Sequence, residues 1–458
     1  MHACAGPAQP QHGQPLVTMK ISSLNTPVNR LALAQGVAYA GRGAAMTALI
    51  WVLYSSTGSS WWVSGAMLAV FGVSTAVSPW SGHVGDRHDR RVVVLASALI
   101  AAFGFAACAV LSELSLTLPI IGVMVLAAST QGALSAAVTG AIPALVAEED
   151  LSGANGVAGA FKSAGFMLGP GVGGALLAVV GPTGVFAASA LLLIGAVASV
   201  WRLPGTFRAE PHPEHGVGSS LDGYRRLIRD PWLRLLTIAW TIVMIAVGPV
   251  IVAEVVLAEQ FAVGSIGYGL IAVFWDGGGV VGALVGRRIP RSLERLAIVG
   301  GCVAIAFGFA VVGLAPVFWP VLLGMFTAGL FDAFGTVAAQ NLIQRRTPDH
   351  LRSRVSAALD AVVIGAMSLS FALGAPLVEL LGPQGVYLAA AVASLAGAVL
   401  LFPTLRGTPV PPFVTGGRAA VTARIRRPAR TAPPHSHEPR GGRMRRLGRR
   451  SLRRRSER

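Results

Sequence analysis

Long apolar runs recur along this chain of 458 residues, and each can cross the roughly 30 Å hydrocarbon core of a bilayer as a helix. Charged residues make up only 12% of the chain, against about 25% in soluble proteins, and the mean hydropathy is +0.64. Spanning segments must pair every backbone group internally, which leaves helices or a closed barrel. These runs lack the alternation of barrel strands. The chain is therefore predicted to be an all-α integral membrane protein.

Turn signals such as Gly181-Pro182 and Gly382-Pro383 divide the apolar regions into twelve predicted spans. These are residues 31–54, 61–81, 92–112, 118–143, 153–180, 184–202, 232–257, 265–285, 294–314, 318–342, 355–381 and 384–404. We expect two six-helix bundles, 30–202 and 232–404, joined by a cytoplasmic linker, 203–231. Residues 1–29 and 405–458 are predicted to be a disordered leader and a disordered basic tail, both cytoplasmic.

Arginines lie on one side of this predicted topology. The loops after predicted helices 2, 6, 8 and 10 carry them, whereas the loops after the odd-numbered helices carry no Lys or Arg. Cytoplasmic loops hold the excess of Lys and Arg, so this side is predicted to face the cytoplasm of a cell with the chain in its inner membrane. Residues 404–458 hold sixteen arginines and two glutamates, most of the net charge of +17. The tail is expected to lie against anionic lipid rather than nucleic acid.

The two predicted bundles also repeat short patterns at an offset of 200 residues. The first repeat pairs Gly82-x-x-x-Asp86-Arg87 with Gly282-x-x-x-Gly286-Arg287. The second pairs Leu151, which follows an acidic triplet, with Leu351, which follows Asp349. Both repeats fall in predicted cytoplasmic loops. Pseudo-symmetric halves related in parallel fashion are therefore expected.

Two motifs suggest a family. The loop Gly82-x-x-x-Asp86-Arg87-x-x-Arg90-Arg91 resembles the loop between helices 2 and 3 of major facilitator superfamily transporters. The fifth predicted helix contains Gly165-x-x-x-Gly169-Pro170-x-x-Gly173-Gly174, which resembles the antiporter signature of drug:proton exporters in that superfamily. The alternative is an ordinary tight crossing, because small residues four apart let helices approach closely. With segments 143–155, 223–232 and 344–355, the order of motifs resembles the twelve-helix macrolide-efflux and siderophore-export branch.

The resemblance implies a gating latch on the cytoplasmic side. Asp86 is expected to face the start of the eleventh helix, where Arg352 and Arg354 lie, and the repeat predicts that Arg287 meets the acidic triplet before the fifth helix. The residues assigned to this latch are Gly82, Asp86, Arg87, Arg90, Arg91, Glu148, Glu149, Asp150, Arg287, Arg352 and Arg354. The alternative is a set of solvated charges that only fixes topology.

Charges inside membrane spans are rare and usually face a cavity. The candidates for binding protons or substrate are Arg42, Lys162, Asp276, Asp332 and Asp360. Helices 1 and 10 line the central cavity in the family, so Arg42 and Asp332 are predicted to form a central pair, either a proton site or a permanent ion pair. Relatives commonly carry an acid after the helix 1 glycine, where this chain has Arg42. Glu254 is expected near the outer end of its span, in contact with solvent.

No catalytic triad, phosphate-binding loop or metal-ligand spacing is present in the sequence, so neither an enzyme nor a cofactor or metal is expected. The family resemblance implies a monomeric secondary exporter. It would move a small amphipathic molecule, drug-like, macrolide-like or siderophore-like, out of the cell in exchange for protons by alternating access. The alternatives are an uptake or facilitator protein of the same fold and a non-transporting membrane sensor or lipid-handling protein.

Overall fold

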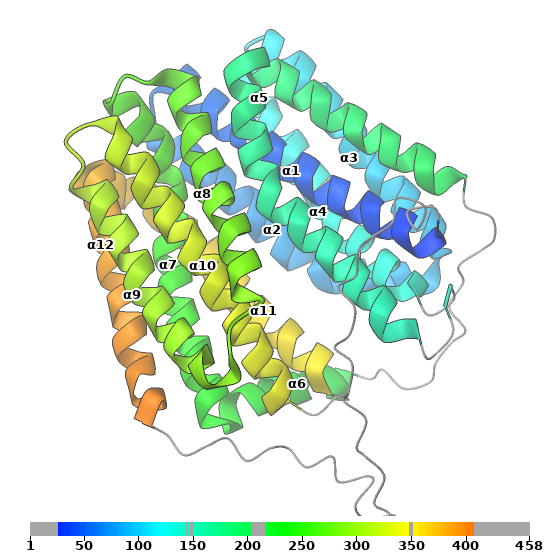
Figure 1. The fold of residues 1–458 in the computed structure, drawn as a ribbon. Helices are drawn as coiled ribbons and strands as arrows, with labels where there is room; N and C mark the ends of the chain where they lie inside the picture. The colour runs from blue at the N-terminus through cyan, green and yellow to red at the C-terminus, as the bar shows by residue number, and fades with distance from the viewer. Residues whose placement is uncertain (1–25, 143–144, 147–149, 203–216, 348–350, 407–458) are drawn as a thin grey trace, which may run out of the picture. The chain divides into compact units, whose positions relative to one another are not determined.

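The computed structural model describes residues 26–142, 145–146, 150–202, 217–347 and 351–406, and all regular secondary structure within these ranges is helical (Figure 1). The first helices are α1 (Pro27–Thr57), α2 (Ser60–Arg87), α3 (Arg90–Glu113), α4 (Thr117–Ala141), α5 (Leu151–Trp201) and α6 (Val217–Arg229). The later helices are α7 (Pro231–Gln260), α8 (Gly264–Gly286), α9 (Glu294–Gly313), α10 (Phe318–Arg346), α11 (Arg352–Ser370) and α12 (Gly374–Leu401). Short 3₁₀ turns cover Arg291–Leu293, Phe371–Leu373 and Phe402–Arg406.

Two glycines interrupt the two longest helical stretches and divide each into two membrane spans. Within the described ranges, ten stretches are long and apolar enough to cross a membrane, and two of these have 49 and 52 residues. A 50-residue helix is about 75 Å long, more than twice the hydrocarbon thickness. Gly181 (φ 70°, ψ 178°) and Gly382 (φ 69°, ψ 167°) break these two stretches with left-handed backbone. Each of these two broken stretches counts as two spans. The ten stretches therefore make twelve crossings, which confirms the predicted number.

The two breaks are copies of one turn. Their sequences are Gly-Pro-Thr-Gly-Val at 181–185 and Gly-Pro-Gln-Gly-Val at 382–386. Glycine adopts the positive φ without a Cβ clash, and the following proline disfavours helical dihedrals at the residue before it. The sequence analysis used both sites as turn signals but missed that they repeat each other.

Helix packing repeats in the same way. We call residues 27–201 the N-terminal half and residues 231–401 the C-terminal half. In the N-terminal half α4 packs on α2 and α3, and α5 packs on α1 and α3; in the C-terminal half α10 packs on α8 and α9, and α12 packs on α7 and α9. The halves meet through α5 on α8 (Figure 1) and through α2 on α11 and α12. We call these two contact surfaces the seam. Two pseudo-symmetric six-helix halves are thus present, as predicted.

The helix ends lie at two faces of the molecule, and hydrogen bonds join neighbouring ends at each face. On one face, Arg90 donates to the Gly140 carbonyl and Arg91 to the Trp201 carbonyl, while Arg295 donates to the Thr404 carbonyl at 3.0 Å. We call this the arginine-rich face. At the other ends of the helices, which we call the opposite face, Ser56 and Thr117 share a hydrogen bond of 3.2 Å.

The predicted linker contains a helix that the sequence analysis did not anticipate. The stretch that separates the halves includes α6, whose glycine lies against α11: a Cβ on Gly223 would collide with the Arg354 backbone. Leu227 is buried, whereas Tyr224 and Ile228 are exposed. The helix is therefore amphipathic, with one side on α11. At the N-terminus, α1 begins at Pro27 with Thr26 as its cap, inside the range predicted as the leader.

Candidate functional site

The glycines of the predicted antiporter signature form a close crossing of α5 with α1. Gly165, Gly169 and Gly173 are buried against α1. A Cβ on Gly169 would lie 2.8 Å from the Ala40 carbonyl oxygen, and one on Gly173 would lie 2.5 Å from the Ala44 Cα. Real Cβ atoms do not approach backbone so closely, so these positions require glycine. The atoms nearest to these three positions all belong to α1 of the same half.

A second side of α5 reaches across the seam to α8. A Cβ on Gly174 would lie 2.5 Å from the Gly269 carbonyl oxygen. Pro170 has no N–H, so the carbonyl four residues earlier lacks its usual intrahelical donor, while the backbone of α5 stays helical through this point. The next residue, Gly171, donates its backbone N–H to Oδ2 of Asp276 at 2.6 Å. A Cβ on Gly171 would lie 2.8 Å from that same oxygen, so glycine permits the approach.

The other contact surface of the seam has a matching hydrogen bond. The 3₁₀ turn Phe371–Leu373 separates α11 from α12, so the first N–H groups of α12 lack intrahelical partners. One of them, on Ala375, donates to Oγ of the buried Ser64 in α2 at 2.7 Å. Each half therefore has one backbone N–H that crosses the seam to a polar side chain, Gly171 within α5 and Ala375 at the start of α12. The acceptor is ionisable at Asp276 and a hydroxyl at Ser64.

Further contacts on this surface lie toward the opposite face. The Trp61 indole N–H donates to Glu379 at 2.5 Å, and the Phe71 and Phe371 rings lie 5.2 Å apart. Thr75 and Ser368 share a hydrogen bond of 3.4 Å nearer the middle of the helices. These contacts hold the two halves together on the side of the opposite face.

Asp276 is 5% exposed, and no ion pair of the described residues includes it. Its neighbour on α7 is Glu254, which lies within electrostatic range of Asp276 and of the tyrosines Tyr268 and Tyr387. Glu254, which was expected near the outer end of its span, is half-buried in the structure.

The predicted pair of Arg42 and Asp332 is not formed in this structure. Among the ion pairs of the described residues, none joins these two side chains. The Arg42 guanidinium instead lies 5.1 Å from the centre of the Phe71 ring, a cation–π contact, and Asp332 lies within electrostatic range of Cys302 on α9. The two side chains therefore face different neighbours.

Lys162 and Asp360 approach each other across the two halves. Lys162 Nζ lies 5.6 Å from the centre of the Tyr39 ring, and its charge acts on the exposed carboxylate of Asp360 in α11. Sequence spacing gave no indication of this proximity, because the two residues lie in different halves.

The structure gives several predicted latch residues other partners. Arg90 and Arg91 bind carbonyls at the ends of α4 and α5, within the N-terminal half. Arg354 pairs at 3.8 Å with Asp222 of α6. Asp150 and Arg287 are both exposed. The remaining latch positions lie outside the described part of the structure, Glu148 and Glu149 entirely and Gly82, Asp86, Arg87 and Arg352 in their side chains, so these predicted contacts stay predictions.

A charge cluster that the sequence analysis missed lies at the ends of α6, α7, α9 and α10. Glu294, only 2% exposed at the start of α9, pairs with Arg345 at the end of α10. Asp230 pairs with Arg226 at 3.4 Å and with Arg346 at 3.2 Å, and it caps α7. These partners are up to 116 residues apart, so only the packing of the helices brings them together.

The sequence of residues 31–363 matches the Major Facilitator Superfamily. The chain belongs to this superfamily. It is therefore a multi-pass membrane transporter and not an enzyme, and the family predicted from the loop and helix motifs is confirmed.

Similar proteins include transporters with export functions. The multidrug efflux pump Tap of Mycolicibacterium fortuitum is 26% identical over 411 residues, covering 83% of this chain and 96% of the relative. The enterobactin exporter EntS of Citrobacter koseri is 27% identical over 355 residues, covering 75% and 82%. Among solved structures, the nucleoside transporter NupG has a TM-score of 0.64 at 14% identity, covering 82% of this chain and 99% of that one. A D-xylose–proton symporter has a TM-score of 0.61 at 14% identity, covering 81% and 96%. The structural likenesses show the fold.

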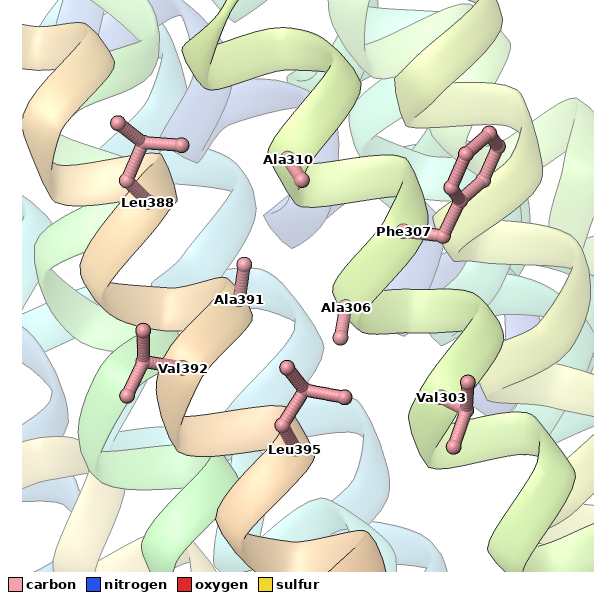
Figure 2. Close-up of a pocket in the computed structure, with 8 residues that line it drawn as sticks. All are labelled: Val303, Ala306, Phe307, Ala310, Leu388, Ala391, Val392 and Leu395. Atoms are coloured by element: carbon pink, nitrogen blue, oxygen red, sulfur yellow. The ribbon is translucent and has the colours of Figure 1, made fainter.

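A hollow between α9 and α12 of the transporter lies away from these polar groups. Figure 2 shows its lining, four side chains from each helix: Val303, Ala306, Phe307, Ala310, Leu388, Ala391, Val392 and Leu395. All eight are apolar, and Phe307 and Val392 are 64% and 67% exposed on the outer surface of their helices. Such a surface suits lipid chains.

Proposed function

We propose that this transporter is a secondary active exporter that moves a small amphipathic molecule out of the cell by alternating access, in exchange for protons. The observation that carries the proposal is the position of ionisable groups inside membrane-crossing helices where the halves meet, with Asp276 buried and hydrogen-bonded across the seam. A charged side chain at this depth costs several kcal/mol and is usually kept for transport or proton transfer. The relatives named as an efflux pump and an enterobactin exporter support the outward direction.

The arginine-rich face is the cytoplasmic face in this proposal, in line with the positive-inside rule. Seam contacts such as Trp61 with Glu379 and Ser64 with Ala375 lie toward the opposite face. The structure then corresponds to a state closed toward the outside. Rocking of the halves would break these contacts and expose the central surfaces to the other side of the membrane.

The proposal includes two parts of the transport mechanism that the sequence analysis predicted. Asp332 carries a proton and Arg42 balances it or holds an anionic group of the substrate. The latch forms on the cytoplasmic side when the transporter opens outward, with Asp86 replacing Asp222 as the partner of Arg354. The present Arg354–Asp222 distance of 3.8 Å is long for an ion pair, which supports an exchangeable contact.

The chain is proposed to act as a monomer in the inner membrane, with residues 30–202 and 232–404 as its two bundles. Its basic tail would lie on the anionic cytoplasmic leaflet. A second candidate function is uptake of a small solute, which is favoured by the fold likeness to the D-xylose–proton symporter.

Inverted membrane vesicles test the proposal. Vesicles with the transporter, energised to an acidic interior, should accumulate a substrate from a panel of macrolides, siderophores and lipids, and collapse of the proton gradient should abolish this accumulation. Vesicles without the transporter are the control. Gradient-driven movement in the reverse direction would favour uptake, and transport that ignores the gradient would refute proton exchange.

A further inference from the structure

We propose that Arg42 and Lys162 together bind the anionic group of the exported substrate, and that this substrate carries one negative charge on an aromatic or apolar body. The residues that make up this anion site are Tyr39, Arg42, Phe71 and Lys162. The inference rests on the proposed function, since it names the chemical class of molecule that the exporter would move.

Three helices of the N-terminal half build the anion site. Tyr39 and Arg42 are three residues apart on α1 and therefore share one face of that helix. The Arg42 guanidinium lies 5.1 Å from the centre of the Phe71 ring in α2, and Lys162 Nζ of α5 lies 5.6 Å from the centre of the Tyr39 ring. All four side chains are half-buried. Two cations and two aromatic rings are thus held together inside membrane-crossing helices.

Arg42 has no acidic partner among the described residues. No ion pair between them includes Arg42, and the nearby charge effect on it comes from Tyr39. Asp276 is bound to the Gly171 amide, and Asp332 lies close to Cys302. The ring contact of Arg42 is attractive but neutralises no charge. A cation inside a span is costly without a counter-charge, and a bound anion would supply that charge.

Lys162 has a partial counter-charge in the other half. Its charge acts on Asp360 of α11, whose carboxylate is exposed although it faces Lys162 across the two halves. The halves therefore do not close on each other at this point. Asp360 offsets one of the two positive charges, which leaves the site with a net charge of about +1. One negative charge on the substrate would neutralise it, whereas a cation would be repelled.

The aromatic rings suit the uncharged part of such a substrate. Each ring face is now covered by a cation, Phe71 by Arg42 and Tyr39 by Lys162. An anion that binds both cations would draw them away from the rings, and the free ring faces would then pack against an aromatic or apolar body. The inside-negative membrane potential also favours outward movement of an anion, in agreement with export.

Fluorescence titrations of the full chain in phosphatidylcholine nanodiscs test the anion site. Three probes share one fluorophore and differ in charge: dansylglycine is an anion, dansylamide is neutral and dansylcadaverine is a cation. The signal from nanodiscs without protein is subtracted. The parent protein should bind dansylglycine about tenfold more tightly than dansylamide, as expected for a charge-assisted contact, and dansylcadaverine most weakly.

Variants then identify the residues responsible. Arg42→Gln should weaken dansylglycine binding about tenfold and leave dansylamide binding nearly unchanged. Arg288→Gln is the matched control, because it removes one exposed positive charge just beyond the end of α8 and should alter neither probe. Asp360→Asn should tighten dansylglycine binding about threefold, since it removes the charge that competes for Lys162. A purely structural role for Asp360 predicts no such gain.

Several results would overturn the inference. These are equal binding of the anionic and neutral probes by the parent, tightest binding of the cation, and unchanged dansylglycine affinity in Arg42→Gln. If Arg42→Gln does not fold, Asp360→Asn decides, because unchanged or weaker anion binding there contradicts the anion site. Binding needs no proton gradient, so Arg42-dependent anion selectivity supports the site even if vesicles show no proton-driven export. Proton-driven export of a cation without dansylglycine binding would remove the anion site and leave the proposed function standing.

Discussion

The crossing of α1 and α5 allows a sharp prediction about stability. In Gly173→Ala the new Cβ would lie 2.5 Å from the Ala44 Cα and 2.8 Å from the Ala44 carbonyl oxygen. Carbon atoms in contact lie about 3.5–4.0 Å apart, so the two helices must separate by about 1 Å. Because the neighbour is backbone, no side-chain rotation relieves the clash. Overpacking of this kind costs about 1–3 kcal/mol, against a helix-propensity gain of about 0.5–1 kcal/mol for replacing glycine.

Gly159→Ala is the matched control, because the same helix has open space around Gly159. It should be neutral or slightly stabilising, while Gly173→Ala should lower the free energy of unfolding by about 1–2 kcal/mol. Titration of each purified variant with sodium dodecyl sulfate in mixed micelles, followed by far-UV circular dichroism, measures the difference. Equal unfolding midpoints for the two variants would refute the argument that glycine at 173 sets the helix separation.

Three further outcomes are expected. Asp332→Asn should abolish proton-driven export while leaving substrate exchange without a gradient, and unchanged gradient-driven export in vesicles would exclude its role as proton carrier. Asp86→Arg and Arg354→Asp should each impair transport, and their combination should restore part of it; an inactive double variant with normal expression would remove this pair from the latch. Arg345→Met should destabilise the protein by about 3 kcal/mol in detergent unfolding, since it leaves the Glu294 carboxylate buried and unpaired, and the double variant with Glu294→Leu should recover most of the loss.

The sequence was informative wherever a property depends on a continuous stretch of chain. Twelve spans followed from apolar length, because a helix in lipid satisfies its own backbone. The breaks at Gly181 and Gly382 followed from glycine before proline, which acts on the local dihedral angles. The single arginine-rich face likewise followed from counting charges in loops, and the helix 5 glycines indicated a close crossing without naming its partner.

Only the tertiary structure decided which residues meet. The partner of Asp276 is a backbone N–H 105 residues away, and the missing Cβ of Gly171 permits this approach. Arg90 and Arg91 were expected to form a latch but bind carbonyls within their own half, and Arg42 lies over Phe71 rather than beside Asp332. Such contacts depend on the rotation and spacing of packed helices, which many distant side chains set together. The local sequence around each residue therefore does not specify them.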